Sequence, residues 1–264
     1  MRQYQVDTIA GVETQCDWRQ APVERQFVEL IAKGKEKSSV VGNNITIPLT
    51  SAVRDQRGGT AMMTIGRITK HVVDSGVDPT GLGRWSWQLM GNKEIKTRVI
   101  VFYNPCQPSK NSKGYTTAEQ QTRYFETKGD FRSARTILFE QLIEQIIVWK
   151  RNGEEAILCG DFNENAYDGR FAARLQQADI MMTEQCKVAT GQRLPATYVT
   201  GTRTIDAVYA TTGIQVTNAA LLPKYGGIGD HRCFIVDFRS ASVIGDVHPN
   251  VIPGTPRKLN CNCV

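Results

Sequence analysis

The stretch AILCGDFNEN, residues 156–165, joins a short apolar run to a polar turn. The apolar half, AILC, predicts a buried strand, and the polar half begins with Gly160 and Asp161. Gly and Asp suit sharp backbone turns, so these ten residues by themselves indicate only a strand that ends in a turn. Whether Asp161 and Asn163 take part in chemistry depends on what the rest of the chain places beside them.

The overall composition favours one large globular domain. The chain has 264 residues, of which 41% are hydrophobic, and this is enough to bury a sizeable core. Its formal net charge of +6 fits a polyanionic partner such as nucleic acid, although many basic proteins bind none. The seven cysteines are odd in number and scattered, which favours a reducing compartment over a disulfide framework.

The sequence contains no sign of a membrane segment. No apolar run approaches the length of a transmembrane helix, and the first residues, MRQYQVDTIAG, lack the apolar core of a signal peptide. We therefore expect an intracellular protein, nuclear or cytoplasmic, with no membrane partner. The sequence does not indicate its oligomeric state.

The spacing of apolar residues predicts strands on both sides of a long helical stretch. This stretch, residues 116–150, is expected to break near Gly129 and Asp130. Shorter helices are expected at residues 21–33 and 170–177. Strand-like segments between turn residues are 7–13, 39–41, 44–48, 59–65, 66–73, 83–89, 95–103, 156–159, 197–200, 204–210, 214–221 and 233–238. This pattern predicts an α/β or α+β sandwich in which helices cover sheets.

The last part of the chain differs in composition from the rest. Pro249, Pro253 and Pro256 interrupt it, and no apolar periodicity is sustained there. We therefore expect one domain over residues 1–239 and a loosely ordered, Pro-rich extension over residues 240–264.

Polar side chains recur where the predicted strands begin or end. Glu13 follows TIAGV, Tyr103 closes RVIVF, Asp161 and Asn163 follow AILCG, Asp206 lies within TIDAVYA, and Asp230 and His231 precede RCFIVDF. Residues at the strand ends of one sheet tend to converge on one edge, where open α/β folds place their sites. We therefore expect these side chains to form a single site.

The carboxylates in this set suit a divalent cation. Hydrolysis of a phosphodiester requires neutralisation of charge on the phosphoryl oxygens, which a bound cation provides. Carboxylate oxygens are preferred ligands of Mg²⁺, which keeps several waters and needs few protein ligands. Glu13 and Asp230 are the expected ligands of Mg²⁺ or Mn²⁺.

The remaining residues of the set have the types needed for hydrolysis by water. Asp161 could orient the attacking water and take its proton, whereas Asn163 and Tyr103 could donate to phosphate oxygens. Asp206 could hold His231, since a carboxylate fixes the tautomer of an imidazole and raises its basicity.

Five segments in this order, GVETQ, VFYNP, CGDFNEN, TRTIDAVYA and GDHRCFIVDF, resemble the endonuclease/exonuclease/phosphatase superfamily, whose fold is deoxyribonuclease-I-like. The resemblance covers residues 7–238. It implies a four-layer α/β sandwich with two facing mixed β-sheets and helices outside. It also implies the roles given above, with Glu13 and Asp230 at the metal and Tyr103 at the scissile phosphate.

The chain departs from the family pattern in two respects that concern the site. The family begins with a strand that carries an Asn before the metal-binding Glu, and only twelve residues precede Glu13 here. We therefore expect a sandwich that lacks the usual first strand, with one active-site group missing. In the family's frequent Tyr-x-Pro-Asn segment, the last place is taken by Cys106.

The function predicted from the sequence is divalent-metal-dependent phosphodiester hydrolysis. The segments GGTAMMTI and GRWSW and the long helix resemble endonuclease domains of retroelements, so the expected partner is nucleic acid, with DNA favoured over RNA. Two alternatives remain. One is a phosphomonoesterase that acts on inositol phosphates or lipids, and the other is a truncated, inactive domain that only binds nucleic acid.

Overall fold

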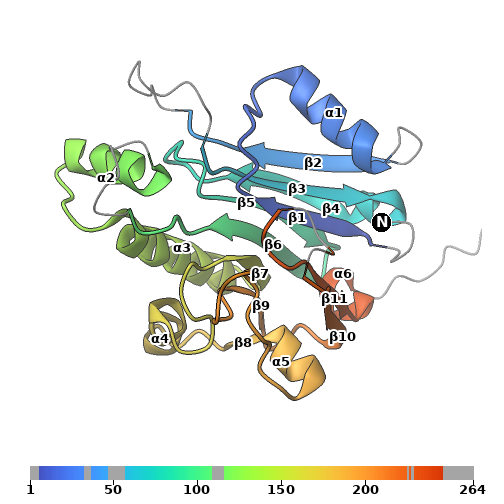
Figure 1. The fold of residues 1–264 in the computed structure, drawn as a ribbon. Coiled ribbons are helices and arrows are strands. Elements are labelled where there is room, and N and C mark those ends of the chain that lie inside the picture. The colour runs from blue at the N-terminus through green and yellow to red at the C-terminus, as the bar shows by residue number, and fades with distance from the viewer. Residues whose placement is uncertain are drawn as a thin grey trace, which may run out of the picture.

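The computed structural model describes residues 6–32, 37–46, 57–108, 116–224, 226 and 229–245 (Figure 1). The largest of its sheets is a six-stranded mixed sheet with the strand order β4-β5-β6-β7-β9-β8. Only β6 and β7 run parallel, and the other neighbours are antiparallel. The six strands are β4 (Val72–Val77), β5 (Trp85–Gly91), β6 (Lys96–Tyr103), β7 (Glu155–Asp161), β8 (Met182–Glu184) and β9 (Asp206–Thr211).

Two smaller sheets cover one face of this large sheet. They are a three-stranded antiparallel sheet in the order β1-β3-β2 and the antiparallel pair β10-β11. Their strands are β1 (Thr8–Val12), β2 (Ser38–Asn43), β3 (Thr60–Ile65), β10 (Val216–Leu221) and β11 (Phe234–Phe238). Within the described residues no ladder joins β1 to β11, so the second layer is divided into two parts.

Helices form the outer layers (Figure 1). Helix α1 lies beside β2, outside the three-stranded sheet, whereas α3 and α4 cover the other face of the six-stranded sheet. The helices are α1 (Ala21–Ala32), α2 (Thr117–Thr127), α3 (Ala134–Arg151), α4 (Arg170–Gln177), α5 (Gln185–Thr190) and α6 (Ser240–Ile244). The predicted sandwich of facing sheets with helices outside is confirmed.

Successive side chains of a strand point to opposite faces of the large sheet, and each face has its own apolar core. Ile100 and Phe102 of β6 pack with the helices, whereas Val99 and Val101 pack with the smaller sheets. This follows from the period of two in a strand, which points successive side chains to opposite faces. The odd-numbered positions of β6 therefore face the space between the two sheet layers, and Tyr103 belongs to that series.

The predicted break in the long helical stretch is confirmed. Helix α2 begins with a capping box between Thr116 and Glu119, and its chain turns at Gly129, whose φ of 79° is left-handed. Helix α3 then starts after Ser133, whose hydroxyl accepts from the backbone N–H of Thr136.

Three predicted strands are wrong. In the segment predicted at 44–48, Ile45 forms only an isolated bridge with Leu82, and residues 47–48 lie outside the described residues. Residues 66–71 form a short 3₁₀-helix, because Gly66 has a φ of 73° and the hydroxyl of Thr69 bonds back to its carbonyl. Residues 197–200 contribute only one bridge, between Tyr198 and His231, because the chain turns directly after Tyr198, whose carbonyl accepts from the N–H of Gly201. Strand β8 and helix α5 have no counterpart in the prediction.

The packed part of the chain continues beyond the boundary predicted at residue 239. Helix α6 follows directly, and its Val243 and Ile244 are buried in the core between the sheets. Residues 246–264, the remainder of the predicted extension, lie outside the described residues. No helix among the described residues is long and apolar enough to cross a membrane.

A fully buried ion pair supports the strand end that carries Tyr103. The guanidinium of Arg84 bonds to both carboxylate oxygens of Asp78, at 2.6 and 2.9 Å. The carbonyl of Arg84 accepts from the backbone N–H of Tyr103 at 2.9 Å. The pair therefore fixes the backbone next to Tyr103 from inside the fold.

We expect Asp78→Ala to lower the free energy of unfolding by about 3–5 kcal/mol, because it leaves the buried charge of Arg84 without its partner. Urea unfolding measures this loss. The matched control is Glu29→Ala, which removes an exposed partner of Arg25 and should change stability far less. Equal losses in the two variants would contradict a stabilising role for the buried pair.

Candidate active site

Three of the predicted site residues lie side by side at one edge of the large sheet. Tyr103 of β6 is paired with Asp161 of β7, and Asp161 is paired with Asp206 of β9. Residues that pair directly across neighbouring strands project to the same face. Since Val101 faces the space between the sheets, these three side chains face it as well.

The smaller sheets bring the other predicted residues to this edge. Nδ1 of His231, three residues before β11, lies 2.8 Å from Oδ2 of Asp206. The ring of Tyr198 packs against the imidazole, with centroids 5.2 Å apart. The hydrogen bond to Asp206 raises the pKa of His231 to about 9, although partial burial acts in the opposite direction. The predicted pairing of Asp206 with His231 is present in the structure.

Asp161 lies at the centre of the cluster. It is only 2% exposed. Burial and the neighbouring Asp206 carboxylate raise its pKa to about 8, and bonds from Asn163 and the charge of His231 act against this rise. Asp161 therefore holds its proton far more tightly than a solvent-exposed aspartate.

Glu13 approaches the cluster from the end of β1. Its backbone has a φ of 50°, and its carboxylate accepts a hydrogen bond from the hydroxyl of Tyr103. Burial, followed by the contact with Glu13, raises the pKa of Tyr103 above its usual range. The hydroxyl of Tyr103 thus stays protonated and acts as a donor.

The side chain of Asn163 is turned inward. Its Nδ2 donates to the carbonyl of Asn104 at 2.7 Å and to Oδ2 of Asp161 at 2.8 Å, and its backbone N–H donates to Oδ1 of Asp161 at 2.7 Å. The predicted donation from Asn163 to a phosphate oxygen would require one of these bonds to be exchanged. In this arrangement Asn163 fixes the orientation of Asp161.

The expected metal ligands, Glu13 and Asp230, do not form the tightest group of donors. Among the described residues, donor atoms of Asp161, Asp206 and His231 lie within 4.8 Å of one another. Asp230 is exposed and close enough to His231 to raise its pKa. The assignment of Glu13 and Asp230 to a metal stays a prediction.

Comparison with known proteins identifies the fold. No family model and no curated protein matches the sequence. An endonuclease/exonuclease/phosphatase from Bacteroides vulgatus superimposes with a TM-score of 0.57 at 16% identity, covering 90% of this chain and 86% of that one. The mannosyl-6-phosphatase Bt3783 of Bacteroides thetaiotaomicron gives 0.57 at 14% identity, covering 90% and 87%. TDP2 of D. rerio, complexed with a single-strand DNA product, gives 0.52 at 12% identity, covering 90% and 88%.

This chain has the endonuclease/exonuclease/phosphatase fold. The five segments that carry the resemblance in sequence therefore lie in the structural context that the resemblance implied. At these identities the likeness shows the fold, and the chemistry has to be argued from the side chains themselves.

Several residues that support the site within this fold were not singled out from the sequence. The hydroxyl of Thr197 accepts from the backbone N–H groups of Ile205 and Asp206, at 3.0 and 3.1 Å, and so fixes the start of β9. Arg135 and Cys106 bond to Asn163. Cys106 was noted only as a departure from the family segment, and no local pattern marks Thr197 or Arg135.

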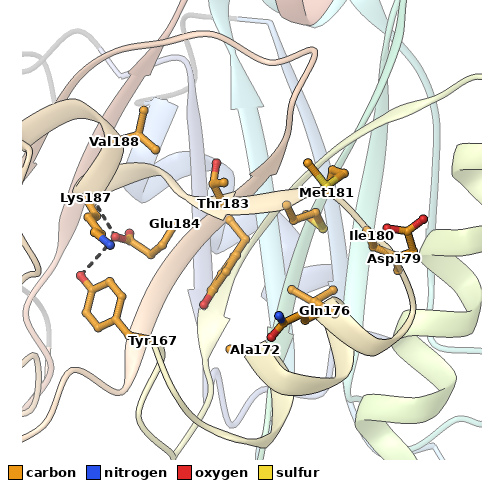
Figure 2. A pocket seen from close by; sticks show the side chains of 13 residues that line it. Tyr167, Ala172, Gln176, Asp179, Ile180, Met181, Thr183, Glu184, Lys187 and Val188 are labelled. Atoms are coloured by element: carbon orange, nitrogen blue, oxygen red, sulfur yellow. Dashed lines mark hydrogen bonds between the residues drawn. The ribbon is translucent and has the colours of Figure 1, made fainter.

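A hollow in the surface lies outside this cluster (Figure 2). It has a volume of about 490 Å³ and lies between α4, β8 and α5. Figure 2 shows Tyr167 beside Glu184, to which its hydroxyl donates at 3.1 Å. Glu184 also caps α5, so these polar groups have structural partners. None of the predicted catalytic residues lines this hollow.

We expect Asp206→Asn to lower the pKa of His231 from about 9 toward its usual value of 6.5, because a neutral amide no longer stabilises the imidazolium. Titration of the imidazole resonances by NMR in metal-free protein measures this shift. Asp168→Asn removes an exposed carboxylate and is the matched control. An unchanged titration in Asp206→Asn would show that Asp206 does not hold His231.

Proposed function

We propose that the protein is a divalent-metal-dependent phosphodiester hydrolase, acting on nucleic acid as a DNA endonuclease-like domain of a retroelement. The observation that carries this proposal is the buried Asp161, flanked in register by Tyr103 and Asp206 on adjacent strands. A general base, a donor and a histidine–aspartate pair are thereby gathered at one sheet edge.

The proton chemistry follows from the environment of each group. A carboxylate whose pKa is raised by burial is a stronger base than a solvated one, so Asp161 is suited to take a proton from water. Asp206 bonds to Nδ1 of His231, which leaves Nε2 to donate to a phosphate oxygen. Tyr103, held as a donor beside Glu13, is suited to the same phosphate.

The charges in the cluster fit a bound cation. Glu13 and Asp206 both act to raise the pKa of Asp161, so the site holds excess negative charge that a divalent ion would offset. Glu13 and Asp230 are the proposed protein ligands, and their oxygens suit Mg²⁺ or Mn²⁺. When bound, the ion would neutralise charge on the phosphoryl oxygens.

Three observations bear on the substrate. The net charge of +6 and the complex of TDP2 with single-strand DNA product support nucleic acid, and DNA before RNA. The similarity to a mannosyl-6-phosphatase supports the alternative of a phosphomonoesterase. A truncated domain that binds nucleic acid without cleavage is the third candidate, and it predicts salt-sensitive binding with no Mg²⁺-dependent products.

We expect the protein to nick supercoiled plasmid with Mg²⁺, and Asp161→Ala to reduce the rate by about 10²- to 10⁴-fold, since it removes the general base. Agarose gels follow the conversion, and chelation with EDTA should abolish it. Asp168→Ala, an exposed acid close in sequence, is the control and should retain full activity. Folded wild-type protein that cleaves no phosphodiester would refute the proposal.

We expect the affinity for Mn²⁺ to increase with pH up to about pH 8, because Asp161 gives up its proton when a cation binds nearby. One released proton corresponds to about a tenfold gain in affinity per pH unit below that pKa. Calorimetric titration at several pH values measures the slope. Asp161→Asn should flatten it, and an equal slope in this variant would assign the proton to another group.

A further inference from the structure

Arg135 connects two chain segments that end at the candidate site. It lies in the first turn of α3, is only 6% exposed, and its guanidinium donates to the carbonyls of Pro105 and Asn163. Both distances are 3.0 Å. Pro105 belongs to the segment that follows β6, and Asn163 to the turn that follows β7. One side chain from the outer helix layer therefore ties together the ends of the two parallel strands.

The burial of this guanidinium is not explained by stability alone. Burial lowers the pKa of Arg135, and the nearby Arg170 acts in the same direction. Among the described residues the Nε atom has no hydrogen-bond partner, and a carboxylate oxygen of Glu164 lies 3.9 Å from the guanidinium. An apolar side chain of similar volume would fill this space without the cost of desolvating a charge.

Of the two carbonyls that Arg135 holds, one belongs to Asn163, which bonds to Asp161, and the other belongs to Pro105, which follows Asn104. Asn163 has a left-handed φ of 48° and donates to both carboxylate oxygens of Asp161. The amide of Asn163 also bonds to the carbonyl of Asn104, directly before Pro105. Displacement of either segment would therefore rotate the carboxylate of Asp161.

Cys106 closes the same network from the side of the β6 segment. Its Sγ donates to Oδ1 of Asn163 at 3.0 Å. Burial, then the charges of Asp161 and Glu13, raise the pKa of this thiol, so it stays protonated and remains a donor. All the polar groups of Asn163 thereby have partners within the protein, and among the described residues Arg135 is the one charged donor to it.

We propose that Arg135 is a positioning residue, which holds the Pro105 and Asn163 carbonyls so that Asn163 presents Asp161 in one fixed orientation. The catalytic part of this inference rests on the proposed hydrolase activity. The structural part, the order of Asn163, can be measured whether or not the protein cleaves a phosphodiester.

The experiment compares Arg135→Ala, Arg135→Lys and the control Arg132→Ala. Arg132 is an exposed arginine just before α3, paired with Asp130 and Glu140. Hydrogen exchange of the Asn163 backbone N–H, followed by NMR, reports the order of the turn. Plasmid nicking gives kcat and KM, Mn²⁺ titration gives the metal affinity, and thermal unfolding gives stability.

We expect Arg135→Ala to speed exchange at Asn163 by about tenfold or more. We also expect kcat to fall by about 10- to 100-fold while KM and Mn²⁺ affinity stay near wild type, because misplaced groups act on the chemical step. The ammonium of Arg135→Lys can reach only one carbonyl. We therefore expect its exchange rate and its kcat to lie between those of wild type and Arg135→Ala. Millimolar guanidinium should restore part of the activity of Arg135→Ala.

Exchange and kcat in Arg135→Ala and Arg135→Lys that match Arg132→Ala would overturn the inference. If Arg135→Ala does not fold, the comparison of Arg135→Lys with wild type decides in the same way. Wild-type protein that is folded but inactive would refute the proposed function, whereas the exchange measurement would still decide whether Arg135 orders Asn163.

Discussion

The parallel pairing of β6 with β7 is the constraint on which the site depends. Both strands end at the same sheet edge, and their register places Tyr103 directly beside Asp161. The antiparallel strand β9 then begins at that edge, and this brings Asp206 to the other side of Asp161. A shift of one residue in either register would turn these side chains into the helix-covered core, since side chains alternate between the faces of a sheet.

Placing acids together in a buried position creates an electrostatic cost that the surrounding residues reduce. Asn163 donates two hydrogen bonds to Asp161, and His231, bonded to Asp206, places a positive charge near both carboxylates. These interactions do not fully offset burial and the neighbouring negative charges, and the pKa of Asp161 is therefore raised. A site with excess negative charge and a high proton affinity is suited to hold a cation and to accept a proton from water.

Local patterns predicted much of this structure because they depend on neighbours in sequence. The helix break at Gly129 and the polar strand ends at Asp161 and Asp206 follow from residue type and periodicity. The same reasoning misassigned residues 66–71, where the left-handed Gly66 begins a 3₁₀-helix in spite of the apolar residues that follow it. The spacing of apolar residues does not predict the backbone conformation that a glycine adopts.

The sequence by itself determined which chemistry is available: carboxylates, a histidine and a tyrosine, each next to a predicted strand. Only the tertiary structure decided which of them meet. It paired Asp206 with His231, turned the amide of Asn163 toward Asp161, and placed Arg135 behind Asn163. The physical reason is that strand register and helix packing, which act between residues far apart in the chain, set these contacts, whereas residue type sets only what each contact can do.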